Sequence, residues 1–416
     1  GDPEAPTQLL ISTIDYNEYV GRIGVGKVDN GSIRVNQECV IVNHHDPEKM
    51  RKVKVGKLYE YEGLNKVEVT EAGIGAIVAI SGIADIHIGD TLCSPDNPEA
   101  IPFQKISEPT IAMNFMVNDS PLAGQEGKFI TSRHLRDRLF GELKKDVSLR
   151  VEETDSPDSF LVKGRGELHL GILIEEIRRE GSEICVSRPE VIVQHDENGK
   201  TLEPMEELII DVPEEYQGVV IQKLAQRKGE LKNMENSGTG VLRLEFKIPT
   251  RGLIGYRGEF LTDTRGLGIL ASRFVGYGEW VGEINARSRG SLVSMDTGTA
   301  TSYALENLQE RGTLFIKPGD PIYNGQVVGE ASRGKDIPCN PCKRKQQTNH
   351  RSATKDMMTV LDVPRTVTVD SALEWISDDE LVEVTPLSVR IRKMILDADQ
   401  RKKARIQAGI RDDDED

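Results

Sequence analysis

The sequence predicts a multidomain chain of mainly β and α+β class: a β-barrel, two ferredoxin-like βαββαβ domains and a mixed C-terminal domain. Three observations lead to this prediction. The chain has 416 residues, which is too long for one ordinary hydrophobic core. Its first hundred residues show only strand patterns. One order of strand and helix patterns then occurs twice in succession.

The strand patterns of the first hundred residues predict the barrel. Segments rich in Val and Ile, such as 9–14, 33–42 and 76–80, are separated by turn sequences such as Asp29-Asn30-Gly31. Closing such a sheet removes its exposed edges, so we expect a β-barrel over residues 1–106.

The repeated pattern predicts the two ferredoxin-like domains. A strand pattern at 110–117 is followed by a helical stripe beginning at Leu135, two strand patterns, a second stripe beginning at Leu170 and a last strand. This βαββαβ order is the split βαβ pattern, predicted here for residues 107–195. The same order recurs at once, which predicts a second such domain over residues 196–284.

Residues 285–416 mix strand and short helix patterns and predict a fourth domain. Ser371 and Glu374 form a capping-box pattern, which predicts the start of a helix there. The segment 333–356 has no apolar period, two prolines and a basic cluster. A run of this length without periodic structure predicts a functional or disordered loop.

Charge is distributed unevenly along the chain. The formal net charge is −15, yet residues 285–411 hold 20 basic and 16 acidic side chains, an excess of +4. The tail 412–416 is entirely acidic, which leaves residues 1–284 with an excess of 14 negative charges. A basic C-terminal region on an acidic chain permits local contact with an anionic partner.

The basic cluster of the loop 333–356 is the strongest candidate for such contact. Its cations suit phosphates and its amides suit ribose or base edges, and it is nearly free of aromatic residues, so we expect backbone and shape recognition. The predicted RNA-binding residues are Lys343, Arg344, Lys345, Gln347, Thr348, Asn349, Arg351 and Lys355.

Secondary RNA contacts are predicted outside the loop. Strand alternation over 389–393 places two arginines on one face that could follow phosphates, and further basic groups lie at 401–405. The predicted secondary contacts are Arg251, Arg257, Arg287, Arg289, Arg390 and Arg392.

Patterns for nucleotide binding and catalysis fail for physical reasons. Residues 21–28 have the spacing of a Walker A loop, but Val28 replaces the Ser or Thr that ligates Mg²⁺, and no helix pattern follows. We predict no catalytic residue and no metal site. Cys339 and Cys342 form a single Cys-x-x-Cys pair with only His350 nearby, too few ligands for a zinc site within this loop.

Two other function classes stay open. One is a metal- or redox-active protein centred on the Cys339/Cys342 loop. The other is a protein-binding scaffold that uses the acidic residues 1–284 as its contact surface.

Cysteine usage and hydropathy indicate the compartment. Five scattered cysteines argue against a disulfide framework and for a reducing cytoplasm. No apolar run is long enough to span a bilayer, so no membrane partner is expected. The start Gly1-Asp2-Pro3 has neither an initiator Met nor an apolar signal segment, which suits an excised piece of a longer protein.

Several motifs together resemble a known group of translation factors. Gly164-Arg165-Gly166-Glu167-Leu168-His169-Leu170 resembles a segment in the third domain of elongation-factor-G-like GTPases. Residues 7–42 are similar to their second-domain barrel, and residues 249–257 to part of their fifth domain. Elongation factor G inserts a fourth domain between the two ferredoxin-like units, which are adjacent here. That arrangement, with Gln347-Thr348-Asn349, Arg351 and residues 378–386, is similar to the BipA (TypA) family of translational GTPases.

The resemblance covers essentially the whole chain and implies a family member without its N-terminal GTPase domain. It implies binding to the 70S ribosome near the factor site, with the C-terminal domain reaching ribosomal RNA and the acceptor end of an A-site tRNA. It carries RNA contact to Lys343, Arg344, Lys345, Asn349 and Arg351. It also implies a cytoplasmic monomer with links to stress response, cold adaptation and large-subunit assembly. GTP and Mg²⁺ are expected only in the missing domain, so we expect this chain to hold no cofactor and to hydrolyse no GTP.

Overall fold

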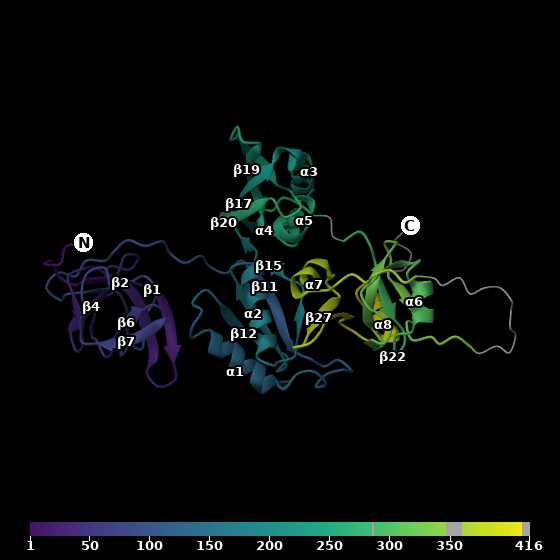
Figure 1. Ribbon diagram of the computed structural model, residues 1–416, viewed down its shortest axis with the longest axis horizontal. Coiled ribbons are helices and arrows are strands. Elements are labelled where there is room, and N and C mark those ends of the chain that lie inside the picture. Colours follow the sequence, from purple (N-terminus) through teal and green to yellow (C-terminus); the bar gives the residue numbers. More distant parts are fainter. Residues whose placement is uncertain (285–286, 347–359, 410–416) are drawn as a thin grey trace. The chain divides into compact units, whose positions relative to one another are not determined.

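A computed structural model of the chain describes residues 1–284, 287–346 and 360–409 (Figure 1). The chain divides into two compact units, residues 1–108 with 136–151, and residues 109–135 with 152–416. The first unit is almost entirely β, and the second combines sheets with helices. No helix within the described ranges is long and apolar enough to cross a membrane.

The first unit is built on an eight-stranded antiparallel sheet in the order β5-β4-β10-β1-β2-β9-β6-β7. Its strands are β1 (Gln8–Asn17), β2 (Gly21–Asn30), β4 (Glu38–Asn43), β5 (Arg51–Lys54), β6 (Leu58–Glu62), β7 (Asn65–Val69), β9 (Ile77–Ile80) and β10 (Asp90–Cys93). A separate two-stranded sheet pairs β3 (Ile33–Arg34) with β8 (Glu71–Ala72).

This sheet curls around a core of buried aliphatic side chains, among them Leu9, Ile11 and Ile80. The curl follows from the chain, because β5 and β6 lie near opposite ends of the strand order and only residues 55–57 separate them. The β class is confirmed, but the predicted closed barrel is corrected. All residues of this unit are described, and its edge strands β5 and β7 do not pair, since β7 bonds only to β6.

Most of the first βαββαβ arrangement belongs to the second unit. The helix α1 (Ser132–Glu142) and the strand β12 (Arg150–Glu153) extend across the boundary between the two units. The strand order β12-β13-β11-β14 is the antiparallel order of a ferredoxin-like fold. Its other elements are β11 (Ile111–Val117), β13 (Ser159–Gly164), α2 (Glu167–Arg179), β14 (Ile184–Ser187) and a short strand β15 (Glu190–Val191) that also pairs with β11.

The helix α2 shows why sequence period predicts this arrangement. Its buried residues form one stripe that includes Leu170, Leu173, Ile174 and Ile177. The helix ends before Gly181, whose φ of 100° lies in the left-handed region that favours glycine.

The second βαββαβ arrangement is likewise confirmed. In its sheet β20 pairs with β17, and the order continues through β19 to β18. Its elements are β16 (Gln194–His195), β17 (Thr201–Pro213), η1 (Glu214–Tyr216), α3 (Gln217–Gln226), β18 (Glu230–Asn236), β19 (Val241–Pro249), α4 (Thr250–Leu253), α5 (Tyr256–Asp263) and β20 (Ile269–Glu279). One face of the sheet and the helices share a core that includes Leu208, Val220, Phe246 and Phe260.

The C-terminal region mixes strands and short helices, as predicted. Its elements are β21 (Ser291–Ser294), β22 (Gly298–Thr299), α6 (Ser302–Leu308), β23 (Gly312–Leu314), β24 (Pro321–Ile322), β25 (Gln326–Ala331), β26 (Ile337–Cys339), α7 (Val369–Trp375), β27 (Glu380–Val384), β28 (Val389–Lys393) and α8 (Ala398–Gln407).

Apart from β22 and β24, which pair as a two-stranded sheet, these strands do not form a sheet of their own. The strand β27 pairs with β14, from Ile184 opposite Val384 to Ser187 opposite Leu381. The order β14-β27-β28-β25-β21-β26 thereby extends the first ferredoxin-like sheet to 11 strands. The sequence analysis did not predict this continuity.

Two local predictions in this region were wrong. The segment 333–356 is not free of regular structure, because β26 pairs in parallel with β21 and buries Cys339 in the local core. The capping box of α7 uses Thr368 as the N-cap and Ser371 as its partner, instead of Ser371 and Glu374. The Thr368 hydroxyl lies three residues before Ser371, which is the spacing that the box requires.

Candidate functional site

The described part of the basic segment is fixed to the first turn of α6. The hydroxyl of Thr301, the N-cap residue, accepts from the Ala304 N–H at 3.2 Å and donates to the Lys343 carbonyl at 2.5 Å. The Thr301 N–H donates to the Pro341 carbonyl at 3.0 Å. The backbone at Pro341 and Lys343, where the run of cations begins, is therefore held by the cap of a helix.

The other end of α6 holds the chain beyond residues 347–359. The side-chain amide of Gln309, the C-cap residue, donates to the Val360 carbonyl at 3.3 Å and accepts from the Asp362 N–H at 3.0 Å. One short helix thus fixes the backbone on both sides of those residues.

Three of the predicted RNA-binding residues can be placed. Lys343, Arg344 and Lys345 are consecutive and exposed, and Thr301 holds the backbone carbonyl of the first of them. The remaining predicted residues lie outside the described part of the chain, as does His350; they are Gln347, Thr348, Asn349, Arg351 and Lys355.

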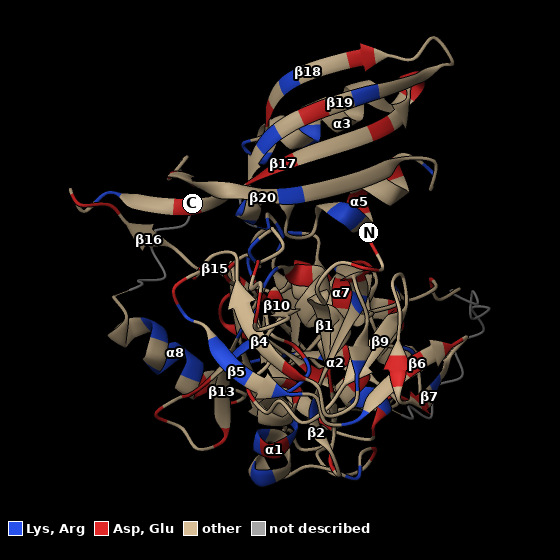
Figure 2. Ribbon diagram, turned by 90° about the vertical axis from the view of Figure 1, so that its left-hand side faces the viewer, with Lys and Arg blue, Asp and Glu red and all other residues tan. Residues whose placement is uncertain are grey.

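A second basic surface lies on α8, which has no buried residue (Figure 2). Lys402, Lys403 and Arg405 are exposed on it. Arg401 instead holds the helix in place, because its Nη1 donates to the carbonyls of Ile395 at 2.9 Å and Leu396 at 2.6 Å.

Two predicted secondary contacts are internal. Arg251 donates through Nε and Nη2 to the fully buried Glu203 carboxylate at 3.2 and 2.9 Å, and stacks 3.6 Å above the Trp280 ring. Arg287 donates to the fully buried Glu380 at 2.9 Å and lies 3.8 Å above the Trp375 ring. These guanidinium groups are partners of buried carboxylates, so their prediction as RNA contacts is corrected.

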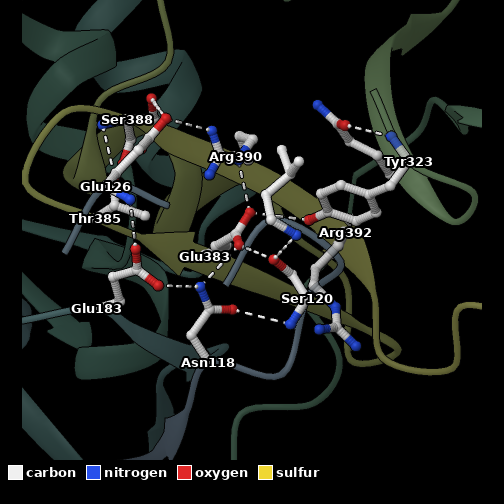
Figure 3. A network of polar contacts seen from close by, with 12 residues as sticks. Asn118, Ser120, Glu126, Glu183, Tyr323, Glu383, Thr385, Ser388, Arg390 and Arg392 are labelled. Carbon is white, nitrogen blue, oxygen red and sulfur yellow. Dashed lines mark hydrogen bonds and ion pairs between the residues drawn. The ribbon is translucent and has the colours of Figure 1, made fainter. Parts of the chain in front are cut away.

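Arg390 and Arg392 do not form the predicted phosphate-following face (Figure 3). Arg390 Nε donates to Glu383 at 2.6 Å and its Nη1 to Glu126 at 3.2 Å. Arg392 is 2% exposed and donates to Asp119 at 2.5 Å. The physical reason is that both guanidinium groups are paired with carboxylates, and the two side chains are only 10% and 2% exposed.

The last two secondary positions remain accessible. Arg257 is exposed on α5. The side chain of Arg289 is 57% exposed and lies 3.5 Å from Glu330. The structure therefore leaves Arg257 and Arg289 as the exposed members of the predicted secondary set.

A buried polar network, missed by the sequence analysis, joins the C-terminal strands to the first ferredoxin-like fold (Figure 3). Fully buried Glu383 on β27 accepts from the Asn118 amide at 2.9 Å, from the Tyr323 hydroxyl at 3.1 Å, and from Ser120 and Arg390. Burial, and then Glu383, raises the pKa of Tyr323 well above its usual value, which keeps it a donor. A single Glu in a strand pattern gives no sequence signal for such a role.

The end of β28 is held by a second charge cluster, which surrounds the buried Lys393 side chain. The Lys393 ammonium lies 2.6 Å from Asp336, 3.0 Å from Asp379 and 3.3 Å from Glu380. Burial alone would raise the pKa of Asp336, but the Lys393 charge and hydrogen bond lower it below its usual value.

The Cys339/Cys342 pair lies in an environment that disfavours thiolate. Burial raises the pKa of Cys339 to about 12, and burial followed by Asp296 raises that of Cys342. Both cysteines are free thiols. The described residues contain no group of three or more His, Cys, Asp or Glu that could hold a metal ion.

The Gly-x-Gly-Glu-Leu-His-Leu motif lies where α2 begins. Glu167 is the first residue of α2, and its Oε2 accepts from the Gly255 N–H at 3.2 Å. Burial raises the pKa of Glu167 to about 7. Gly255 is the N-cap of α5 and has a φ of 85°, so the motif contacts the second ferredoxin-like fold at a turn that favours glycine.

Family models match three stretches of the chain. Residues 21–93 match elongation factor Tu domain 2, residues 200–288 match the elongation factor G C-terminus, and residues 289–398 match the TypA/BipA C-terminal domain. With the sheets described above, these matches define a set of domains of the translation-factor class.

Sequence comparison with curated relatives identifies the family within this class. Proteins named large ribosomal subunit assembly factor BipA are 50% identical over 394 residues in Synechocystis sp., 47% over 402 in Bacillus subtilis and 47% over 404 in Escherichia coli K12. These matches cover 95%, 96% and 97% of this chain. They cover 66%, 65% and 66% of the relatives, so the chain spans about two thirds of their length. The chain belongs to the BipA/TypA family.

Proposed function

We propose that this chain docks on the 70S ribosome and contacts ribosomal RNA and A-site tRNA through its C-terminal region. The observation that carries the proposal is the exposed run Lys343-Arg344-Lys345, whose first residue is held through its backbone carbonyl by the cap of α6. It lies inside the stretch that matches the TypA/BipA C-terminal domain. In this proposal the contact also includes the other predicted residues of the loop, which are Gln347, Thr348, Asn349, Arg351 and Lys355.

The physical basis is electrostatic. Each lysine or arginine that neutralises a phosphate releases condensed counterions, so three adjacent cations favour binding in a salt-dependent way. Anchoring the preceding backbone reduces the ordering that binding must otherwise impose. The exposed α8 cations, with Arg257 and Arg289, are further sites for phosphate contact.

The wider role follows from the family. The relatives' name supports a function in large-subunit assembly, and we extend it to stress-responsive translation in the cytoplasm, with the chain acting as a monomer. GTP hydrolysis, with GTP and Mg²⁺, is assigned to a domain outside these residues, where nucleotide state biases docking through domain orientation. Unchanged ribosome affinity of the full-length factor with GTP and with GDP would exclude that coupling.

The test is co-sedimentation of the chain with 70S ribosomes across a salt series, beside a Lys343/Arg344/Lys345→Ala variant. Three lost phosphate contacts should weaken binding and flatten the log–log salt slope by roughly two to three units. A matched control, Lys232/Arg243/Lys247→Ala, removes three exposed cations from the second ferredoxin-like sheet and should bind like the parent chain.

Other outcomes have distinct meanings. Equal loss of binding in both variants would indicate a nonspecific charge effect, and no loss in either would place the contact elsewhere. Binding that survives ribonuclease treatment would favour the protein-binding scaffold instead.

A further inference from the structure

A buried carboxylate shapes the loop before α1. Glu183 is 2% exposed and accepts from the backbone N–H groups of Gly124 at 2.8 Å, Glu126 at 3.1 Å and Gly127 at 2.7 Å. The Asn118 amide donates to it at 3.1 Å. A side chain at position 127 would lie 2.4 Å from the Glu183 Cγ, so the turn requires glycine there.

The residues after this turn lie along residues 181–183, which lead into β14. The Lys128 N–H donates to the Gly181 carbonyl at 2.8 Å, and the Glu183 N–H donates to the Phe129 carbonyl at 3.1 Å. Phe129 and Ser182 form a parallel β-bridge. The backbone at Lys128 and Phe129 is therefore held in one conformation, although it lies at the surface.

This backbone presents an aromatic pair. The rings of Phe129 and His134 are stacked, with centroids 4.0 Å apart and planes at 6°. Phe129 and its neighbour Ile130 are each 40% exposed. Adjacent exposed apolar side chains, unlike single scattered ones, mark a candidate interaction surface.

The charged side chains of this segment have one sign. Lys128 and Arg133 are exposed, and the segment 127–134 contains no Asp or Glu. An exposed aromatic stack with cations on neighbouring residues suits an unpaired nucleotide, because the rings offer stacking surface for a base and the cations can bind its phosphates. A double-stranded segment, whose bases are already stacked, would gain little there.

We infer that Lys128, Phe129, Arg133 and His134 form a second RNA-contact surface, which stacks an unpaired base and binds its flanking phosphates. This inference rests on the proposed RNA-docking function and adds a contact that favours single-stranded over double-stranded RNA. The surface differs from the loop 333–356, which was predicted to recognise backbone and shape.

The test measures binding of a short fluorescein-labelled single-stranded RNA of mixed sequence, and of a duplex of equal length. Phe129→Leu keeps the apolar volume and removes the π-face, so affinity for the single strand should fall roughly tenfold with an unchanged salt slope. Phe129→Tyr restores the ring and should bind like the parent chain. Lys128→Ala with Arg133→Ala should instead flatten the salt slope by roughly one to two units.

The results separate this inference from the proposed function. If Phe129→Leu binds the single strand like the parent chain while Lys343/Arg344/Lys345→Ala binds less tightly, the inference is wrong and the proposed function stands. If Phe129→Leu loses affinity equally for the single strand and for the duplex, the stacking role is also overturned. If the parent chain binds neither RNA nor ribosomes, both proposals fail.

Discussion

The side chains of Glu203, Glu380 and Glu383 have no exposed surface, and each is paired with an arginine that the sequence analysis took for an RNA contact. A buried carboxylate without a partner costs several kcal/mol, so such arginines are fixed by the interior of the protein. A sequence shows which residues are cationic but not which carboxylates the fold buries beside them. An exposed cation such as Lys343 does not neutralise a buried carboxylate.

Removal of one of these arginines should therefore lower stability. We expect Arg251→Ala to reduce the free energy of unfolding by roughly 3–5 kcal/mol, because Glu203 is left buried without its ion partner. Chemical unfolding of the 416-residue chain measures the change. The control is Arg243→Ala, whose side chain is 52% exposed in its pair with Asp211, so the expected loss of stability is much smaller. A comparable small loss in both variants would contradict this role for Arg251.

At the scale of elements, the short helix α6 connects the fold to the candidate RNA segment. Its N-cap and C-cap residues hydrogen-bond the backbone on either side of residues 347–359. The arrangement separates two contributions to RNA affinity, the charge of the cations and the position of the backbone that carries them.

Loss of the Thr301 hydroxyl should weaken RNA binding without changing any charge. Thr301→Val removes both the helix cap and the bond to Lys343, at an expected cost of about 1 kcal/mol in stability. RNA affinity should fall while the salt slope stays constant, since the cations remain. Thr301→Ser keeps the hydroxyl and serves as the control. A flattened slope in the Val variant would show that the cations had been displaced.

The elements themselves were largely predictable where the signal is local. The buried stripe of α2 follows the 3.6-residue period, and alternation along β19 follows the two-residue period. The pairing of β14 with β27 was not predictable, because it joins residues about two hundred positions apart and leaves no local pattern. Neither was β26, whose three residues include a proline.

The candidate site was predictable to the same extent. The basic run is visible in the sequence because charge and composition are local properties. Its attachment to α6 and the burial of Arg390 and Arg392 depend on long-range packing, so the sequence could not reveal them. The Phe129/His134 pair was also missed, because its two rings meet only through the turn around Glu183.

At the scale of the whole second unit, a carboxylate pair lies where α2, α5 and α7 meet. Glu167 of α2 accepts from Gly255, and the Glu374 side chain of α7 lies beside Gly255 and Gly258. Burial, then the charges of Glu167 and Asp370, raises the pKa of Glu374 to about 8. Arg227 opposes this shift and Glu259 adds to it. For Glu167, Asp370 adds to the effect of burial, while the Gly255 N–H, Arg227 and Arg257 oppose it.

Stability of this junction should decrease as pH rises. Both carboxyl groups have folded-state pKa values above the ordinary 4.5, so the folded state binds more protons than the unfolded state between about pH 4.5 and 8. The stability that these two protonated carboxyl groups contribute is fully present below about pH 4.5. It is lost as the pH rises to about 8, which lowers the free energy of unfolding by an amount on the order of a few kcal/mol. Unfolding measured across this range should show the decline.

An uncharged replacement isolates the effect. Glu374→Gln should flatten the decline, because one of the two interacting charges is gone. Glu215→Gln, at an exposed position, should leave it unchanged. If the Glu374→Gln variant keeps the pH dependence of the parent chain, this carboxylate pair is excluded as its source.

The most direct test of the RNA-docking account is photo-crosslinking from position 344 in a complex with 70S ribosomes. A photoreactive residue that replaces Arg344 should crosslink to ribosomal RNA, while the same residue at the exposed position 243 of the second ferredoxin-like sheet should give little RNA adduct. Adducts from position 344 to ribosomal proteins alone, or equal RNA adducts from both positions, would contradict the account.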